Sequence, residues 1–133
     1  QQLLASTVEE EIGFGLKYRG VKPEEISRKI EPLLTLFEIE HLRSVFPLNL
    51  SWGEKRRVVL AACLALEPEY LILDEPTTGL DENRISTLNQ VLLRLREKGV
   101  GMLLISHNPE FVQANAQRIL RLEGGAIADD SSS

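Results

Sequence analysis

The order of apolar and polar residues divides the chain into a helical first half and a second half in which strands alternate with helices. Two early stretches repeat apolar residues at helical spacing: Val8, Ile12 and Leu16, and then Ile26, Ile30, Leu33, Leu34 and Phe37. Thr7 and the glutamate three positions later predict a capping box at the first helix. Gly20 is placed to end that helix, and Pro23 to begin the next.

Three residues interrupt these helical patterns. Gly13 and Gly15 lie within the first helix and should weaken it, because glycine loses the most backbone entropy on folding. Pro32 lies within the second, where its missing amide predicts a kink or a split. Residues 38–49 then form a short turn or helix that leads into a loop around Pro47.

A third helix is predicted over residues 51–67. Ser51 and Glu54 have the spacing of a second capping box, and Pro68 stops the helix. The interior of this segment is apolar almost all round, which is typical of a buried helix.

The remaining chain alternates strands and helices. Short apolar runs at 70–73 and 102–105 predict two strands buried on both faces, separated by an amphipathic helix over 81–97. A third strand is expected over 117–122, and the tail at 129–133 reads as disordered. This order predicts an α/β fold with a parallel sheet and right-handed crossovers. Three parallel strands make a poor sheet, and missing upstream strands would explain this.

Composition and charge narrow the function classes. The 133 residues are enough for one domain with a sizeable core, and no apolar run approaches the length of a membrane-spanning helix. The net charge of -5 argues against a broad surface for nucleic acid. A single cysteine, Cys63, excludes an internal disulfide and fits a reducing cytoplasm. The sole methionine is Met102 and the chain opens at Gln1, so we expect a piece of a longer protein.

Two adjacent acids form the strongest chemical motif. The apolar strand at 70–73 delivers Asp74 and Glu75 to its carboxyl end, where open α/β sheets bind their ligands. Neighbouring residues on an extended chain point to opposite sides, so these acids suit two separate tasks. Asp74 could hold Mg²⁺ through water, and Glu75 could orient or deprotonate a water that attacks a phosphate. The alternative is an ordinary strand that ends in a solvated acidic turn.

The segment Leu50-Ser51-Trp52-Gly53-Glu54 is the second motif. A hydroxyl and free amides at the start of a helix suit an anionic phosphate. The basic residues Lys55, Arg56 and Arg57 follow where cations oppose the helix dipole, and a nearby anionic partner would offset that cost. By itself the segment favours a plain capping box on a buried helix.

A third motif follows the second strand. His107 should lie at the same sheet edge as the two acids, where it could donate a hydrogen bond to a terminal phosphate. A lone histidine after a strand is more often structural. In the turn after the first strand, Thr78-Gly79-Leu80-Asp81, the aspartate reads simply as the cap of the long helix.

Taken in order, these motifs resemble the ATP-binding subunit of ATP-binding cassette (ABC) transporters. Leu50 to Glu54 is similar to the family signature Leu-Ser-Gly-Gly-Gln, and Tyr70 to Glu75 to the Walker B strand. Thr78 to Asp81 is similar to the D-loop, and His107 to the switch histidine. The opening residues, Gln2 to Glu10 followed by Gly13-Phe14-Gly15, are similar to the energy-coupling-factor and cobalt/nickel importer branch.

The resemblance implies a fold and a role for each motif residue. Residues 1–66 would form a helical subdomain with the signature, and 67–133 the C-terminal part of a P-loop NTPase (RecA-like) core. Asp74 would bind Mg²⁺ through water, while Glu75 would polarise the hydrolytic water and His107 would contact the γ-phosphate. The residues implied to act across the dimer, on ATP or on the partner subunit, are Ser51, Gly53, Glu54 and Asp81.

The resemblance also implies partners and a location. The parent protein would be a cytoplasmic ATPase, peripheral at the inner face of the cell membrane. A second ATPase subunit, in a homo- or heterodimer, and a transmembrane transporter subunit would be its partners, with no nucleic acid. MgATP hydrolysis would drive solute uptake.

The sequence departs from the family pattern at three points. Trp52 replaces the first signature glycine, and Glu54 replaces the glutamine. No Gly-x-x-x-x-Gly-Lys-Ser/Thr sequence occurs, so the loop that cradles the phosphates is missing and the chain alone should be inactive. Two alternatives remain open: a noncatalytic partner-binding or dimerisation module derived from such an ATPase, and an ABC ATPase that is not a transporter.

Overall fold

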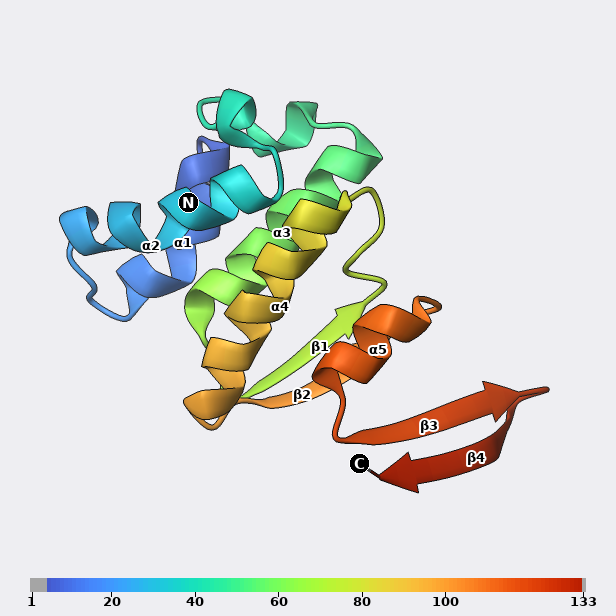
Figure 1. Cartoon of the computed structure of the whole chain (residues 1–133). Coiled ribbons are helices and arrows are strands. Elements are labelled where there is room, and N and C mark those ends of the chain that lie inside the picture. The colour runs from blue at the N-terminus through green and yellow to red at the C-terminus, as the bar shows by residue number, and fades with distance from the viewer. Residues whose placement is uncertain (1–4, 133) are drawn as a thin grey trace.

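The structure is a computed structural model that describes residues 5–132 (Figure 1). Gln2, Leu3 and Leu4, which contribute to the importer-like opening, and Ser133 of the tail lie outside the described residues. In chain order the elements are α1 (Val8–Tyr18), α2 (Pro23–Leu36), the 3₁₀ turns η1 (Glu40–Leu42) and η2 (Pro47–Asn49), α3 (Trp52–Leu66), β1 (Tyr70–Asp74), α4 (Glu82–Glu97), β2 (Gly101–Ile105), α5 (Pro109–Asn115), β3 (Arg118–Glu123) and β4 (Ala126–Ser132).

The first helix is capped as the sequence indicates, with one difference. The Thr7 hydroxyl accepts a hydrogen bond from the Glu10 amide at 3.2 Å. The Glu10 carboxylate, however, accepts from the Ser6 amide at 2.8 Å, one residue earlier than in a capping box. One hydroxyl and one carboxylate thus satisfy amides that have no partner inside the helix, which stabilises its start.

Gly13 and Gly15 allow α1 to pack closely against two neighbouring helices. A Cβ atom on Gly13 would lie 2.7 Å from Ile26 Cγ2 of α2, and one on Gly15 would lie 2.5 Å from Leu66 Cδ1 of α3. The entropic cost of these two glycines is therefore accompanied by closer packing of α1 against α2 and α3. Pro32 does not split α2, which continues to Leu36.

One continuous apolar cluster runs from the helices to the strands. It confirms the apolar spacing predicted for α1 and α2 and the amphipathic character predicted for α4. Its members include Val8, Ile12, Leu16, Ile30, Leu33, Leu34, Phe37, Leu88, Leu92 and Leu95. Helix α1 packs on α2 and α3, α2 also contacts α4, and α4 contacts α5. In Figure 1, α1 and α2 lie at one end of the molecule and the β3–β4 hairpin lies at the other.

The strands β1 and β2 pair in parallel, as predicted, but only one face of the pair is covered. Leu71 and Leu73 are buried against the helices. The residues of the other face are exposed: Tyr70, Ile72, Leu103 and Ile105. The prediction of strands buried on both faces is therefore wrong within the described residues, since no element lies over this second face.

Helix α3 is also less buried than its sequence suggests. Val58, Ala61, Leu64 and Ala65 lie in the core, whereas Val59 is exposed. Leu60 and Cys63 are partly buried against this core, so burial of the helix is incomplete rather than absent. No helix within residues 5–132 is long and apolar enough to cross a lipid bilayer.

The third strand does not join the parallel sheet. Strand β3 pairs antiparallel with β4 in a separate hairpin. Gly124 and Gly125 both have positive φ at its turn, the conformation that two-residue hairpin loops favour. The tail predicted to be disordered belongs to this hairpin as far as Ser132, because an Arg118–Asp130 ion pair and the backbone ladder hold it.

Candidate functional site

The carboxyl end of β1 places two acids beside the end of β2. Asp74 pairs with Ile105 in the strand register. The Glu75 amide then donates to the Ile105 carbonyl at 2.8 Å, and Thr78 N donates back to the Glu75 carbonyl at 3.3 Å. Glu75 has a φ of 50°, in the left-handed region that a residue with a Cβ seldom adopts. The backbone of Glu75 is thus fixed on both sides in an unfavourable conformation.

The Glu75 carboxylate and the His107 imidazole are in direct contact. His107 Nδ1 lies in hydrogen-bond contact with Glu75 Oε1, and the His107 amide donates to Oε2 at 3.4 Å. The Glu75 side chain is 25% exposed, whereas that of His107 is 94% exposed. Both carboxylate oxygens therefore face one residue, His107, whose ring is otherwise open to solvent.

Asp74 lies next to this pair on the open face of the sheet. Its side chain is exposed and stands at the register position of Ile105. Residues 5–132 contain no group of three His, Cys, Asp or Glu side chains that could hold a metal ion. One carboxylate is still compatible with Mg²⁺, because this ion keeps several waters and takes other ligands from phosphates.

Arg56 of α3 is a member of this site that the sequence analysis did not assign. Its guanidinium Nη2 donates to the Glu75 carbonyl at 2.6 Å and also contacts the Asp74 carbonyl. Chain geometry could have indicated this contact. The helix rises about 15 Å from Arg56 to Leu66, and the strand returns about 13 Å from Tyr70 to Asp74. The first turns of α3 and the carboxyl end of β1 should therefore lie side by side.

The segment similar to the family signature forms the capping box that the sequence predicts. Ser51 N donates to Glu54 Oε2 at 2.8 Å, and the Glu54 amide donates to Ser51 Oγ at 3.2 Å. The Ser51 amide holds the pKa of Glu54 below its usual range, so this acid is the cap partner of the helix. Nothing lies within 4 Å of a Cβ placed on Gly53, and Trp52 is 78% exposed.

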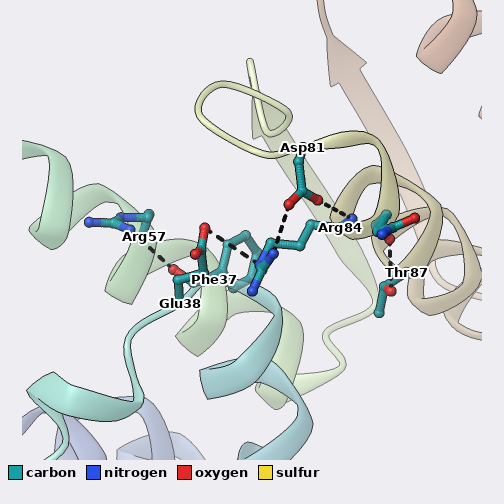
Figure 2. A network of polar contacts seen from close by, with 7 residues as sticks. Phe37, Glu38, Arg57, Asp81, Arg84 and Thr87 are labelled. Atoms are coloured by element: carbon teal, nitrogen blue, oxygen red, sulfur yellow. Dashed lines mark hydrogen bonds and ion pairs between the residues drawn. The ribbon is translucent and has the colours of Figure 1, made fainter.

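Asp81 caps α4 and joins a polar network that reaches the first half of the chain (Figure 2). Its Oδ1 accepts from the Arg84 amide and its Oδ2 from Arg84 Nη1, both at 2.8 Å. Arg84 Nε lies 3.5 Å from Glu38 Oε2, just beyond α2. Arg57 of α3 donates to the neighbouring Phe37 carbonyl at 3.3 Å. Two arginines thus hold the turn at the end of α2.

The Asp81 network predicts a stability change at acidic pH. The Arg84 amide lowers the pKa of Asp81, so this carboxylate stabilises the fold above about pH 4 and loses that effect as the pH falls through its lowered folded pKa. In Asp81→Asn the cap remains but the charge is lost. In thermal scans we expect the Asn variant to melt below the wild type at pH 7, and the difference in melting temperature to shrink as the pH falls below about 4. A difference in melting temperature that does not change with pH would contradict this role of the Asp81 charge.

The predicted site residues fall into three groups in the structure. Asp74, Glu75 and His107 meet at the end of β1, as the sequence indicates. Ser51 and Glu54 bond to each other beside Gly53, and Asp81 bonds to Arg84. Within residues 5–132, no hydrogen bond joins the second or third group to the first. Arg84 was also missed, although its position three residues after Asp81 is a known helix spacing for ion pairs.

Comparison with known proteins agrees with the order of these motifs. The family model described as "ABC transporter" matches residues 1–78, more than half of the chain. The chain belongs to the ABC transporter family. Among curated ABC relatives, the energy-coupling factor transporter ATP-binding protein EcfA2 of Clostridium perfringens is 37% identical over 132 residues. That match covers 97% of this chain and 46% of the relative.

Solved ABC ATPase structures have the same fold. An ATP-binding subunit of an ABC transporter matches with a TM-score of 0.76 and 30% identity, over 98% of this chain and 55% of that chain. CbiO1 of Clostridium perfringens, described as part of the ABC transporter complex cbiONQ, matches with a TM-score of 0.61 and 30% identity, over 98% and 53%. The α/β fold predicted from the sequence, with part of a P-loop NTPase sheet, is confirmed.

The chain spans between a quarter and about half the length of the curated ABC relatives that it matches. The ABC family binds ATP, usually with Mg²⁺, and its members act as transport ATPases.

Proposed function

We propose that this chain is the C-terminal part of the ATP-hydrolysing subunit of an ABC importer. In the proposed full-length protein, a phosphate-binding half completes the site, and hydrolysis of MgATP drives solute uptake. The contact between the Glu75 carboxylate and the His107 imidazole, beside Asp74, is the observation that carries this proposal. An acid fixed near an exposed donor at the carboxyl end of a strand suits the activation of water next to a phosphate.

In the proposed reaction, Glu75 accepts a proton from water while the water oxygen attacks the γ-phosphorus. The bond between that phosphorus and the bridging oxygen breaks, and its electron pair leaves with ADP. The His107 ring contacts Glu75 Oε1, and the His107 backbone amide donates to Oε2, so the ring would turn away from Oε1 to admit water at that oxygen. Its exposure allows it to turn toward the terminal phosphate. Asp74 would hold Mg²⁺ through water, and this ion would neutralise phosphate charge.

The remaining motif residues are assigned to a dimer. Ser51, Gly53 and Glu54 would close over ATP held by the opposite subunit, using the exposed start of α3. Asp81 would communicate across that interface. Residues 1–66 would form the helical subdomain that meets a transmembrane subunit, at the cytoplasmic face of the cell membrane, and 67–133 would complete the ATPase core.

Similarity to two transporter components supports the importer branch. EcfA2 is an energy-coupling factor transporter ATP-binding protein, and CbiO1 is part of the complex cbiONQ. Their names support a membrane partner for this chain.

The chain alone should neither bind MgATP tightly nor hydrolyse it. It has the acids and the histidine but no Gly-x-x-x-x-Gly-Lys-Ser/Thr loop, and positioning by that loop supplies much of phosphoryl-transfer catalysis. Calorimetric titration of the 133-residue chain with MgATP should detect no binding tighter than the millimolar range. Micromolar binding would show that the chain has a second way to hold nucleotide, and would overturn this part of the proposal.

One observation favours a second candidate, a noncatalytic partner-binding module. Trp52 occupies the position of the first glycine in the family signature, and it is 78% exposed. Its indole would therefore contact any molecule that binds at the start of α3. A large apolar ring suits a protein interface better than a nucleotide pocket that must close tightly. Restoring glycine with Trp52→Gly in the full-length protein discriminates the two, because only an ATPase should gain turnover.

A further inference from the structure

The guanidinium of Arg56 joins the start of α3 to the acidic end of β1. One nitrogen, Nη2, donates hydrogen bonds to the carbonyl oxygens of two successive residues, Asp74 and Glu75. Arg56 follows Glu54 of the capping box by two positions and is half-buried. A single side chain therefore connects the helix that follows the signature segment to the residues of the proposed catalytic site.

Both carbonyls lie where the backbone changes direction. Asp74 is the last residue of β1, and Glu75 has its φ of 50° directly after it. An extended residue followed by a left-handed one can aim both carbonyl oxygens at one donor. The contact with Arg56 is made in this geometry, so it favours the conformation that Glu75 would otherwise seldom adopt.

Arg56 stands where its charge is unfavourable for its own helix. It lies in the first turns of α3, where cations oppose the helix dipole. Within residues 5–132, no ion pair includes Arg56. The carbonyls of Asp74 and Glu75 thus offset the unfavourable position of the Arg56 charge, and the core residues Val58 and Ala61 hold the helix itself.

We propose that Arg56 is a positioning residue that fixes the Asp74–Glu75 backbone and so keeps the Glu75 carboxylate against His107. Any movement of the start of α3 then reaches the acidic end of β1 through this side chain. The inference rests on the proposed function only in that the placement of Glu75 matters for turnover. The contact itself can be tested without ATP.

Three variants of the 133-residue chain test the proposal. Arg56→Met keeps the apolar stem and removes the donors, while Arg56→Lys retains a charged donor. Arg94→Met makes the same change at an exposed arginine of α4 and is the matched control. Two NMR signals are measured: exchange of the Glu75 amide with solvent, and the ¹⁵N shifts of the His107 ring. Methyl signals of the core report whether each variant is folded.

In Arg56→Met we expect Glu75 amide exchange to rise about tenfold or more, and the His107 shifts to move toward those of a free ring. Arg56→Lys should recover part of both signals, and Arg94→Met should change neither. If Arg56→Met leaves both signals as in the wild type, the proposal is wrong. If Arg56→Met does not fold, Arg56→Lys decides: wild-type signals overturn the proposal, and intermediate signals support it.

Activity of the full-length protein separates this inference from the proposed function. We expect Arg56→Met to lower kcat about tenfold or more with little change in the KM for ATP. If Glu75→Gln removes turnover and Arg56→Met does not, only the inference about Arg56 fails. If Glu75→Gln has no effect, the proposed function fails, while the NMR result on Arg56 still stands.

Discussion

Glu75→Gln in the full-length protein is expected to lower ATP turnover by about 10²–10⁴-fold. Glutamine has nearly the same shape and can still contact His107, but its amide cannot accept a proton from water. Binding of ATP does not need that proton, so the variant should accumulate as an ATP-bound dimer. Phosphate release and the mass of the complex with MgATP measure the two effects.

The control for this prediction is Glu97→Gln, the same change at the exposed end of α4. It should hydrolyse ATP like the wild type. Unchanged turnover in Glu75→Gln would remove the catalytic assignment and favour the noncatalytic module. Lost turnover without a trapped dimer would indicate that Glu75 is needed for nucleotide binding rather than for the chemical step.

Phe37→Ala is expected to destabilise the chain by about 3–5 kcal/mol, because it leaves a cavity in the core. Phe37 is 1% exposed at the end of α2, and its carbonyl accepts the hydrogen bond from Arg57 (Figure 2). Truncation therefore removes packing beside the turn that Arg57 and Arg84 hold. Urea denaturation measures the change in the free energy of unfolding.

Phe14→Ala is the matched control, since Phe14 belongs to α1 but is 49% exposed. Its loss should cost less than about 1 kcal/mol, because surface substitutions usually have small effects. Equal destabilisation by both changes would mean that the segment around Phe37 is not part of the core as described.

Local patterns in the sequence were sufficient to predict the helices and the first two strands. The spacing of Val8, Ile12 and Leu16 and the capping pair Ser51 and Glu54 act within a few residues, so they can be read directly. The meeting of Glu75 with His107 was also predictable, because parallel strands end at the same sheet edge.

What could not be predicted depends on contacts between distant segments. Apolar residues such as Ile72 and Val59 indicate burial, but only the presence of a neighbour decides it, and here both are exposed. Gly124 and Gly125 are a local signal for a hairpin turn, but the polar residues 129–132 after them do not have the pattern of a strand, so β4 was missed. The link from Arg84 to Glu38 spans two halves of the chain.

At Glu75 the backbone conformation lowers the stability of the fold, whereas the side chain is needed for the proposed chemistry. Such a conformation costs a residue with a Cβ about 1–2 kcal/mol, whereas glycine adopts it without that cost. Selection for stability alone would therefore replace this glutamate with glycine. A stabilising substitution at this position would remove the carboxylate that the proposed function needs, so a search for more stable variants of the chain should leave position 75 unchanged.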